Sequence, residues 1–259
     1  MEDTKLHKVI DGKNIFYDLK LDIIFEEFVD ICDNDRTNVT SPRDLCIELT
    51  NSCNFLCKNC FSQKKATFLS LNKTIEYIKY YESKVIRMCL TGGEPLLNPE
   101  FRNIVGYLNK ISNMGKVINT NGFYLDDTLC NLLKKNGWTV AVSLHGKSET
   151  HNEYVGFDSY DRIIKSLTLL RKYSINTHIY TVIHNDFEEN DILHLIELKK
   201  DFNISDLRLI KIRENGLYQN INNNNLTQIP ENFAASIFYK TKKSNTIFIS
   251  AEQEIRLSN

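Results

Sequence analysis

Short apolar runs alternate with longer segments in which apolar residues recur every three or four positions. The runs predict β-strands, at residues 45–49, 85–90, 116–119, 138–144, 176–183 and 206–212. The periodic segments predict helices, at residues 72–83, 101–111, 126–135, 160–172 and 189–200. Regular alternation of this kind predicts an α/β fold with a parallel sheet and right-handed crossovers. Six such units would make an incomplete parallel (βα)6 barrel.

Two segments lie outside this pattern, so we divide the chain into a core at residues 43–215 and two extensions. The N-terminal extension, residues 1–42, contains an apolar group that predicts a short helix capping one end of the barrel: Ile23, Ile24, Phe25, Phe28 and Val29. The C-terminal extension, residues 216–259, begins with a polar low-complexity stretch and includes an apolar run at 246–249. We expect this tail to supply substrate contacts or to extend the sheet.

Composition and charge narrow the kind of protein. With 259 residues, 42% of them hydrophobic, the chain can bury a full core as one large domain. Its net charge of −1 gives no bulk attraction to nucleic acid or to an anionic membrane, so we expect neither as a partner. The N-terminus carries no apolar signal stretch, and no run reaches the ~18 apolar residues of a membrane span. These features predict a cytoplasmic protein.

Three cysteines, Cys53, Cys57 and Cys60, are spaced so that one loop can bring them together. Three thiolates are one fewer than a four-iron cluster needs, which leaves one iron open to a small molecule. Zinc sites usually present four ligands, so an iron–sulfur cluster is the preferred interpretation. The remaining cysteines, Cys32, Cys46, Cys89 and Cys130, are isolated from one another in the sequence and are interpreted as small core residues without a role.

A second motif follows the predicted strand at residues 85–90. Gly92 and Gly93 carry no side chains, so the backbone there can approach a ligand closely. Glu94 then offers a carboxylate to a cation.

Together the two motifs resemble those of the radical S-adenosylmethionine (SAM) superfamily. The resemblance implies a barrel of six units and a 4Fe-4S cluster on Cys53, Cys57 and Cys60. It also implies that Gly92, Gly93 and Glu94 hold the SAM ammonium group. Members cleave SAM reductively to a 5′-deoxyadenosyl radical, which abstracts a hydrogen from the substrate. An external electron donor such as a flavodoxin or ferredoxin is then needed, because no flavin or second-cluster motif is visible.

The stretch from Val142 to Gly146, with the following segment at 151–154, resembles the fourth strand and loop of peptide-modifying members. The chain departs from that pattern at Asn59, where an aromatic residue is common, and at Val155 and Gly156, where an arginine is often found. It also lacks the cysteine-rich region that binds auxiliary clusters. We expect epimerisation or crosslinking of a ribosomally made peptide. A nucleoside, sugar or other small metabolite is the alternative substrate, and a non-catalytic iron–sulfur or zinc protein is the third reading.

Side chains alternate across a strand, which indicates which residues face the barrel interior. Glu48 is expected to face inward beside Cys46 and Thr50, and His145 shares a face with Ser143. Glu48 and His145 are therefore the catalytic candidates. Asn119 and Ser143 end two neighbouring strands and are candidates to bind SAM. The same residues could instead be strand-end or turn residues near solvent. Lys211 and Arg213 on the sixth strand face either the barrel interior or solvent at the strand end. The turn at 184–186 either closes the site or is only a turn.

Overall fold

The computed structural model describes residues 5–26, 42–60, 62, 64–184 and 186–211, with short strands at 236–237, 246–249 and 255–257. One sheet of nine strands has the order β10-β9-β8-β7-β6-β5-β4-β11-β12. Its six central strands are parallel and follow chain order: β4 (Asp44–Glu48), β5 (Arg87–Thr91), β6 (Gly115–Thr120), β7 (Trp138–Ser143), β8 (Asn176–Ile183) and β9 (Asp206–Lys211). The predicted six-unit α/β fold is confirmed.

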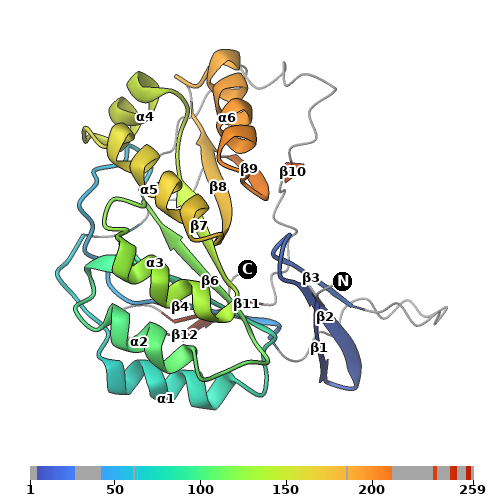
Figure 1. Cartoon of the computed structure of the whole chain (residues 1–259). Coiled ribbons are helices and arrows are strands. Elements are labelled where there is room, and N and C mark those ends of the chain that lie inside the picture. The colour runs from blue at the N-terminus through green and yellow to red at the C-terminus, as the bar shows by residue number, and fades with distance from the viewer. Residues whose placement is uncertain are drawn as a thin grey trace.

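Helices cover one face of this sheet (Figure 1). They are α1 (Leu71–Tyr81), α2 (Phe101–Leu108), α3 (Asp127–Leu133), α4 (Ser148–Val155), α5 (Tyr160–Lys172) and α6 (Glu189–Asp201), with short 3-10 turns η1 (Pro95–Leu97) and η2 (Lys134–Asn136). The large core lies between sheet and helices, where Ile47 and Ile118 pack among the same buried residues as Ile104. Helix α4 was not predicted, because it buries only His151, Tyr154 and Val155 and so lacks a clear apolar stripe.

The N-terminal extension differs from the prediction. Residues Ile23–Glu26 form strand β3, which pairs antiparallel with β2 (Lys13–Asp18), and β2 pairs with β1 (Lys5–Ile10). The predicted helix is therefore wrong for Ile23, Ile24 and Phe25; Phe28 and Val29 lie outside the described residues. β-Branched and aromatic side chains favour a strand here, and the Phe16 and Phe25 rings stack across the pair at 5.4 Å.

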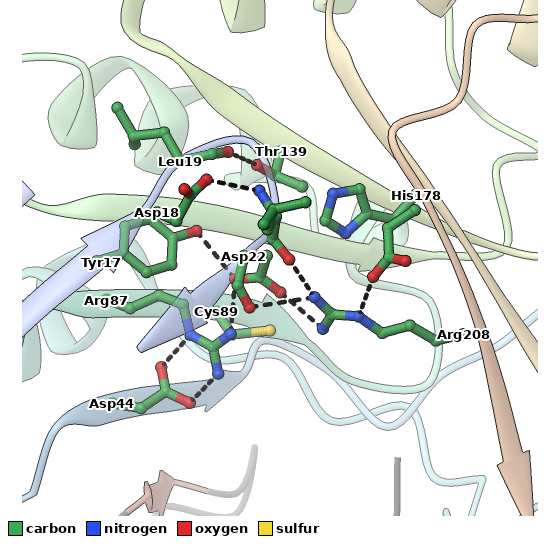
Figure 2. Close-up of polar contacts among 12 residues, drawn as sticks. Tyr17, Asp18, Leu19, Asp22, Asp44, Arg87, Cys89, Thr139, His178 and Arg208 are labelled. Carbon is green, nitrogen blue, oxygen red and sulfur yellow. Dashed lines mark hydrogen bonds and ion pairs between the residues drawn. The ribbon is translucent and has the colours of Figure 1, made fainter. Parts of the chain in front are cut away.

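This three-stranded ribbon caps the N-terminal ends of the parallel strands through Asp22 (Figure 2). One carboxylate oxygen of Asp22 accepts hydrogen bonds from the Tyr17 hydroxyl at 2.9 Å and from Arg87 at 2.6 Å. The other accepts from Arg208 at 3.0 Å, and Arg87 also forms a bidentate pair with Asp44. Burial alone would raise the pKa of Asp22, but Arg87 and Arg208 hold it below its ordinary value. A charged cluster therefore fastens the ribbon to the end of the barrel.

The described part of the C-terminal extension adds strands at both edges of the sheet. Strand β11 (Thr246–Ile249) pairs parallel with β4, and β12 (Ile255–Leu257) pairs antiparallel with β11. At the other edge, β10 (Ser236–Ile237) pairs parallel with β9. The apolar run at 246–249 thus adds a strand, and a role of this tail in substrate binding stays a prediction.

The face of the sheet opposite the helices, called here the inner face, has the expected side-chain alternation. Leu45, Ile47 and Leu49 are fully buried in the core beneath the helices, while Cys46 and Glu48 between them are partly exposed. On the neighbouring strands a small separate cluster lies on the inner face, formed by Cys46, Cys89, Val117, Ala141 and Tyr180. The predicted inward direction of Cys46 and Glu48 agrees with this burial pattern.

Candidate active site

The loop with the three cysteines leaves the C-terminal end of β4 and rests on helix α4. The backbone amides of Leu56 and Lys58 donate to the carbonyl oxygens of Val155 and Tyr154, at 2.8 and 3.0 Å. The last carbonyls of a helix have no partner within it, so the loop satisfies them. Phe55 is 1% exposed and stacks on Phe157, just after the end of α4, at 5.6 Å, which adds an apolar contact between the loop and this helix end. Val155, where the sequence departs from the expected pattern, is thus an anchor of the cysteine loop.

Each of the three thiols is partly buried. Burial raises the pKa of Cys53, and it raises the pKa of Cys57 to about 12, where Cys53 and Cys60 add to the rise. The Phe55 amide, which donates to the Cys53 sulfur at 3.4 Å, and the Lys64 ammonium oppose these rises without cancelling them. In the described ranges, no three His, Cys, Asp or Glu side chains are grouped to hold a metal ion. Three soft donors on one loop are the ligand type that an iron–sulfur cluster takes, so a cluster on these cysteines stays a prediction.

The two glycines after β5 bring their backbone against the start of the cysteine loop. The amides of Gly93 and Glu94 donate to the carbonyl oxygens of Thr50 and Ser52, at 2.7 and 2.8 Å. A Cβ atom would lie 2.2 Å from the Thr50 oxygen at Gly92 and 2.3 Å from the Ser52 oxygen at Gly93. The close approach seen here is therefore between two protein loops, and the predicted approach to a ligand stays a prediction.

The Glu94 side chain is fully buried and holds three segments together. Its carboxylate accepts hydrogen bonds from the Leu96 amide at 3.0 Å, the Thr120 hydroxyl at 2.7 Å and the Asn121 amide at 2.7 Å. Burial raises its pKa to about 7 although these hydrogen bonds oppose the rise. No cationic side chain pairs with it in the described part of the chain. A buried carboxylate without a counter-charge is costly, so its environment fits a ligand cation.

Two buried polar atoms at the end of β6 and in the cysteine loop are unsatisfied. The side-chain oxygen of Asn119 and the side-chain nitrogen of Asn54 are buried without a hydrogen-bond partner. Asn121 donates to the Asn54 oxygen at 2.8 Å and so connects the end of β6 to the cysteine loop. Ser143 is partly exposed at the end of β7. Buried polar groups are normally paired, so the atoms of Asn119 and Asn54 fit a polar ligand that is still to bind.

The two catalytic candidates have different surroundings. Glu48 is partly exposed on the inner face, where β4 ends and the cysteine loop begins. His145 is 5% exposed; its Nδ1 accepts from the Val182 amide at 3.0 Å, and its ring lies 4.6 Å from that of Tyr154. Burial lowers the pKa of His145 well below its ordinary value, so the ring is neutral. Catalytic roles for both stay predictions, and the side chain of Lys211 and all of Arg213 lie outside the described residues.

One link was not predicted from sequence. Lys58, between two of the cysteines, forms ion pairs with Glu153 of α4 at 2.8 Å and with Asp186 after β8 at 3.1 Å. Beside it, His184 stacks on Tyr154 at 4.3 Å, and both its ring nitrogens are buried without a hydrogen bond. His184 and Asp186 therefore lie against the residues that support the cysteine loop, and Asn185 lies outside the described residues. Nothing in the local spacing of Lys58 indicated these distant partners.

Comparison with known protein families identifies the superfamily of this chain. The family described as the radical SAM superfamily matches residues 47–198. The chain belongs to the radical SAM superfamily. This match confirms the expected superfamily of enzymes. In the described parts, no helix is both long and apolar enough to cross a membrane.

Among similar curated proteins is a GTP 3',8-cyclase of Clostridium perfringens, 27% identical over 194 residues, covering 71% of this chain and 60% of the cyclase. Another is the serine-type anaerobic sulfatase-maturating enzyme of Bacteroides thetaiotaomicron, 30% identical over 156 residues, covering 52% of this chain and 37% of that enzyme. The chain therefore spans about 60% of the length of the cyclases it matches.

Similar solved structures support the fold. Streptococcus suis SuiB bound to S-adenosylmethionine has a TM-score of 0.69 at 15% identity, covering 85% of this chain and 65% of SuiB. The structure of anSMEcpe with bound AdoMet and the Cp18Cys peptide has a TM-score of 0.58 at 22% identity, covering 70% and 55%. At these identities the likeness shows the radical SAM fold alone.

Proposed function

We propose that this radical SAM protein cleaves SAM reductively and abstracts a hydrogen atom from a peptide substrate. One observation carries the proposal: hydrogen bonds from Gly93 and Glu94 join the loop of the three cysteines to a buried carboxylate that lacks a counter-charge. A site for an iron–sulfur cluster and a site for an ammonium group thus lie side by side at the C-terminal edge of the sheet. Ligands of parallel α/β sheets bind at this edge.

The residues divide the work as follows. Cys53, Cys57 and Cys60 hold the 4Fe-4S cluster, and Glu94 holds the SAM ammonium group. When bound, the cluster supplies the electron that breaks a SAM carbon–sulfur bond and yields the 5′-deoxyadenosyl radical. Asn119 and Ser143 hydrogen-bond the ribose or the carboxylate of SAM. A flavodoxin or ferredoxin supplies the electron from outside, in the cytoplasm, where such a cluster can be maintained.

A peptide substrate is favoured by one observation. SuiB, in its structure bound to the precursor peptide SuiA, has the same fold as this chain, with a TM-score of 0.67. Epimerisation or crosslinking of a peptide is the proposed outcome.

A nucleoside substrate is the second candidate, because GTP 3',8-cyclases are among the similar proteins. The rate of SAM cleavage with each added molecule distinguishes the peptide substrate from the nucleoside substrate. GTP should leave this rate unchanged, whereas a precursor peptide encoded beside the gene should increase it. Stimulation by GTP and conversion of GTP to a new product would favour the nucleoside instead.

The central experiment is anaerobic reconstitution followed by a SAM cleavage assay. The protein should bind about four irons per chain and release 5′-deoxyadenosine and methionine on reduction with dithionite. A variant with Cys53, Cys57 and Cys60 all changed to Ala should lose both properties, while the buried Cys130→Ala control should keep both. Iron binding without 5′-deoxyadenosine would indicate a non-catalytic iron–sulfur protein, and a single bound zinc would refute the cluster.

A further inference from the structure

Two cysteines without a role in the proposed site are neighbours on the inner face. Cys46 on β4 and Cys89 on β5 are direct partners across the parallel strand pair. Both belong to the small cluster on the inner face, where the neighbouring Cys46 thiol and burial raise the pKa of Cys89 well above its ordinary value. The Cys89 thiol donates to the Leu90 carbonyl oxygen at 3.9 Å. Cys46 is partly exposed, while Cys89 is 6% exposed. The register therefore places two thiols side by side, with Cys46 as the more accessible of the two.

The pair lies directly below the site. Two residues further along their strands are Glu48 and Thr91, which also pair with each other, and the two motif loops begin just after them. A step of two residues along a strand is about 6.6 Å, so the thiols lie roughly one side-chain layer beneath that edge. Two residues earlier on the same strands, Asp44 and Arg87 form an ion pair at the N-terminal end of the sheet (Figure 2). The dithiol thus forms the floor of the space that a substrate would enter.

We propose that Cys46 is a hydrogen-atom donor to a carbon radical formed on the inner face, and that Cys89 positions it. This inference rests on the proposed function. A thiol S–H bond is weaker than most C–H bonds, so transfer of its hydrogen atom to a carbon radical is favourable. The S–H bond of Cys46 breaks, a C–H bond forms, and a thiyl radical remains on Cys46. One electron from the external one-electron carrier and one proton from solvent then restore the thiol.

Other hydrogen sources near the site are less suitable. The Tyr180 hydroxyl, in the same cluster, donates to Asp22 and accepts from Arg208, so its hydrogen is engaged in the charged cluster at the N-terminal ends of the strands. Cys130 belongs to the core beneath the helices and is fully buried there. The thiols of Cys53, Cys57 and Cys60 lose their protons when they bind iron. Among the described cysteines, Cys46 is thus the partly exposed inner-face thiol that is not a proposed cluster ligand.

The test needs SAM and no substrate. In D2O the thiols exchange to S–D, whereas the C–H bonds of SAM do not exchange. The reconstituted protein, reduced with dithionite in the absence of added thiols, should release 5′-deoxyadenosine that contains deuterium, seen by mass spectrometry. Cys46→Ala should lose this deuterium while it still releases 5′-deoxyadenosine, and Cys130→Ala should match the parent.

The outcomes separate this inference from the proposed function. Absence of 5′-deoxyadenosine would refute the proposed function itself. Normal release without deuterium, or with deuterium unchanged in Cys46→Ala, would overturn the role of Cys46 alone. A second variant tests Cys89: Cys89→Ala should lower the deuterium content of the released 5′-deoxyadenosine without changing the amount released, and a deuterium content equal to that of the parent overturns the positioning role of Cys89.

Discussion

The hydroxyl of Thr120 donates a hydrogen bond to the buried carboxylate of Glu94 at 2.7 Å. The end of β6 is thereby tied to the loop after β5, and the same carboxylate receives the amide of Asn121. Glu94 therefore organises the edge of the sheet before any ligand arrives. Because its pKa is raised to about 7, its charge depends on pH in the physiological range.

The affinity for SAM should accordingly depend on pH. The carboxylate form attracts the ammonium group and the protonated form does not, so affinity should fall roughly tenfold for each pH unit below about 7. Glu94→Gln should bind SAM roughly ten- to a hundredfold more weakly and without this dependence. Equilibrium dialysis between pH 5.5 and 7.5 measures both. Thr120→Val keeps the carboxylate and should keep the pH dependence; a flat profile in the parent would refute the role of Glu94.

The same shift affects stability with the opposite sign. The folded-state pKa of about 7 lies above the ordinary value of 4.5, so ionisation disfavours the ligand-free fold. The stability contribution of Glu94 is present below pH 4.5 and is lost as pH rises through 7. Comparing urea unfolding of the ligand-free parent and Glu94→Gln at pH 5 and 8 isolates this contribution. A difference between the two proteins that does not change with pH would contradict it.

Gly93→Ala should disrupt the junction of the two motif loops. The new Cβ would lie 2.3 Å from the Ser52 carbonyl oxygen, which belongs to backbone and cannot move aside freely. We expect reduced iron content after reconstitution and a lower midpoint of thermal unfolding. Gly106→Ala is the matched control, because that glycine lies in α2 with open space around it. It should stabilise the protein by roughly 0.5–1 kcal/mol, and equal loss of iron in both variants would exclude a specific effect at Gly93.

Asp22→Asn should destabilise the whole fold by roughly 1.5–3 kcal/mol, because it removes the buried carboxylate that Arg87 and Arg208 share and leaves each with one aspartate, Asp44 or Asp206. Urea unfolding at pH 7 measures the loss. The pKa of Asp22 is below its ordinary 3.8, so its contribution is present above that pH and is lost as pH falls through the folded-state value. Asp127→Asn removes an exposed pair with Lys172 and should change little. Similar effects of the two substitutions would show that the buried cluster adds no stability.

Glu48→Gln should leave the cluster spectrum and the fold intact. Its partly exposed place on the inner face suits contact with substrate. We expect product formation to fall more than release of 5′-deoxyadenosine without substrate. Both quantities can be followed in one chromatographic assay. Failure of the variant to fold, or turnover equal to the parent, would mean that Glu48 is structural or merely exposed.

The repeating parts of this fold were accessible from sequence. Helix Tyr160–Lys172 and strand Asn176–Ile183 have the predicted bounds, because their apolar spacing is regular and their burial follows it. Helix α4 was missed because its packing is supplied by His151 and Tyr154, which a hydrophobicity pattern does not count. Strand β3 was misassigned because three consecutive apolar residues fit either a helix or a strand.

At the site, spacing identified the three cysteines and Glu94 but not their supports. The contact of Leu56 and Lys58 with the end of α4 joins residues almost a hundred positions apart. Likewise Asp22 meets Arg208 across 186 positions. Such pairs depend on the path of the whole chain, and no local pattern in a single sequence contains them. Cys46 and Cys89 were isolated in sequence for the same reason, although the register of β4 and β5 makes them neighbours.

The ribbon fastened by Asp22 also has a consequence for the order of events during turnover. Because it covers the N-terminal ends of the strands, we expect molecules to reach the inner face from the opposite edge, where SAM is proposed to bind. A peptide that arrives last would then cover the SAM fragments beneath it. Methionine and 5′-deoxyadenosine should leave only after the modified peptide has gone, which is a compulsory sequence of release imposed by a blind-ended barrel.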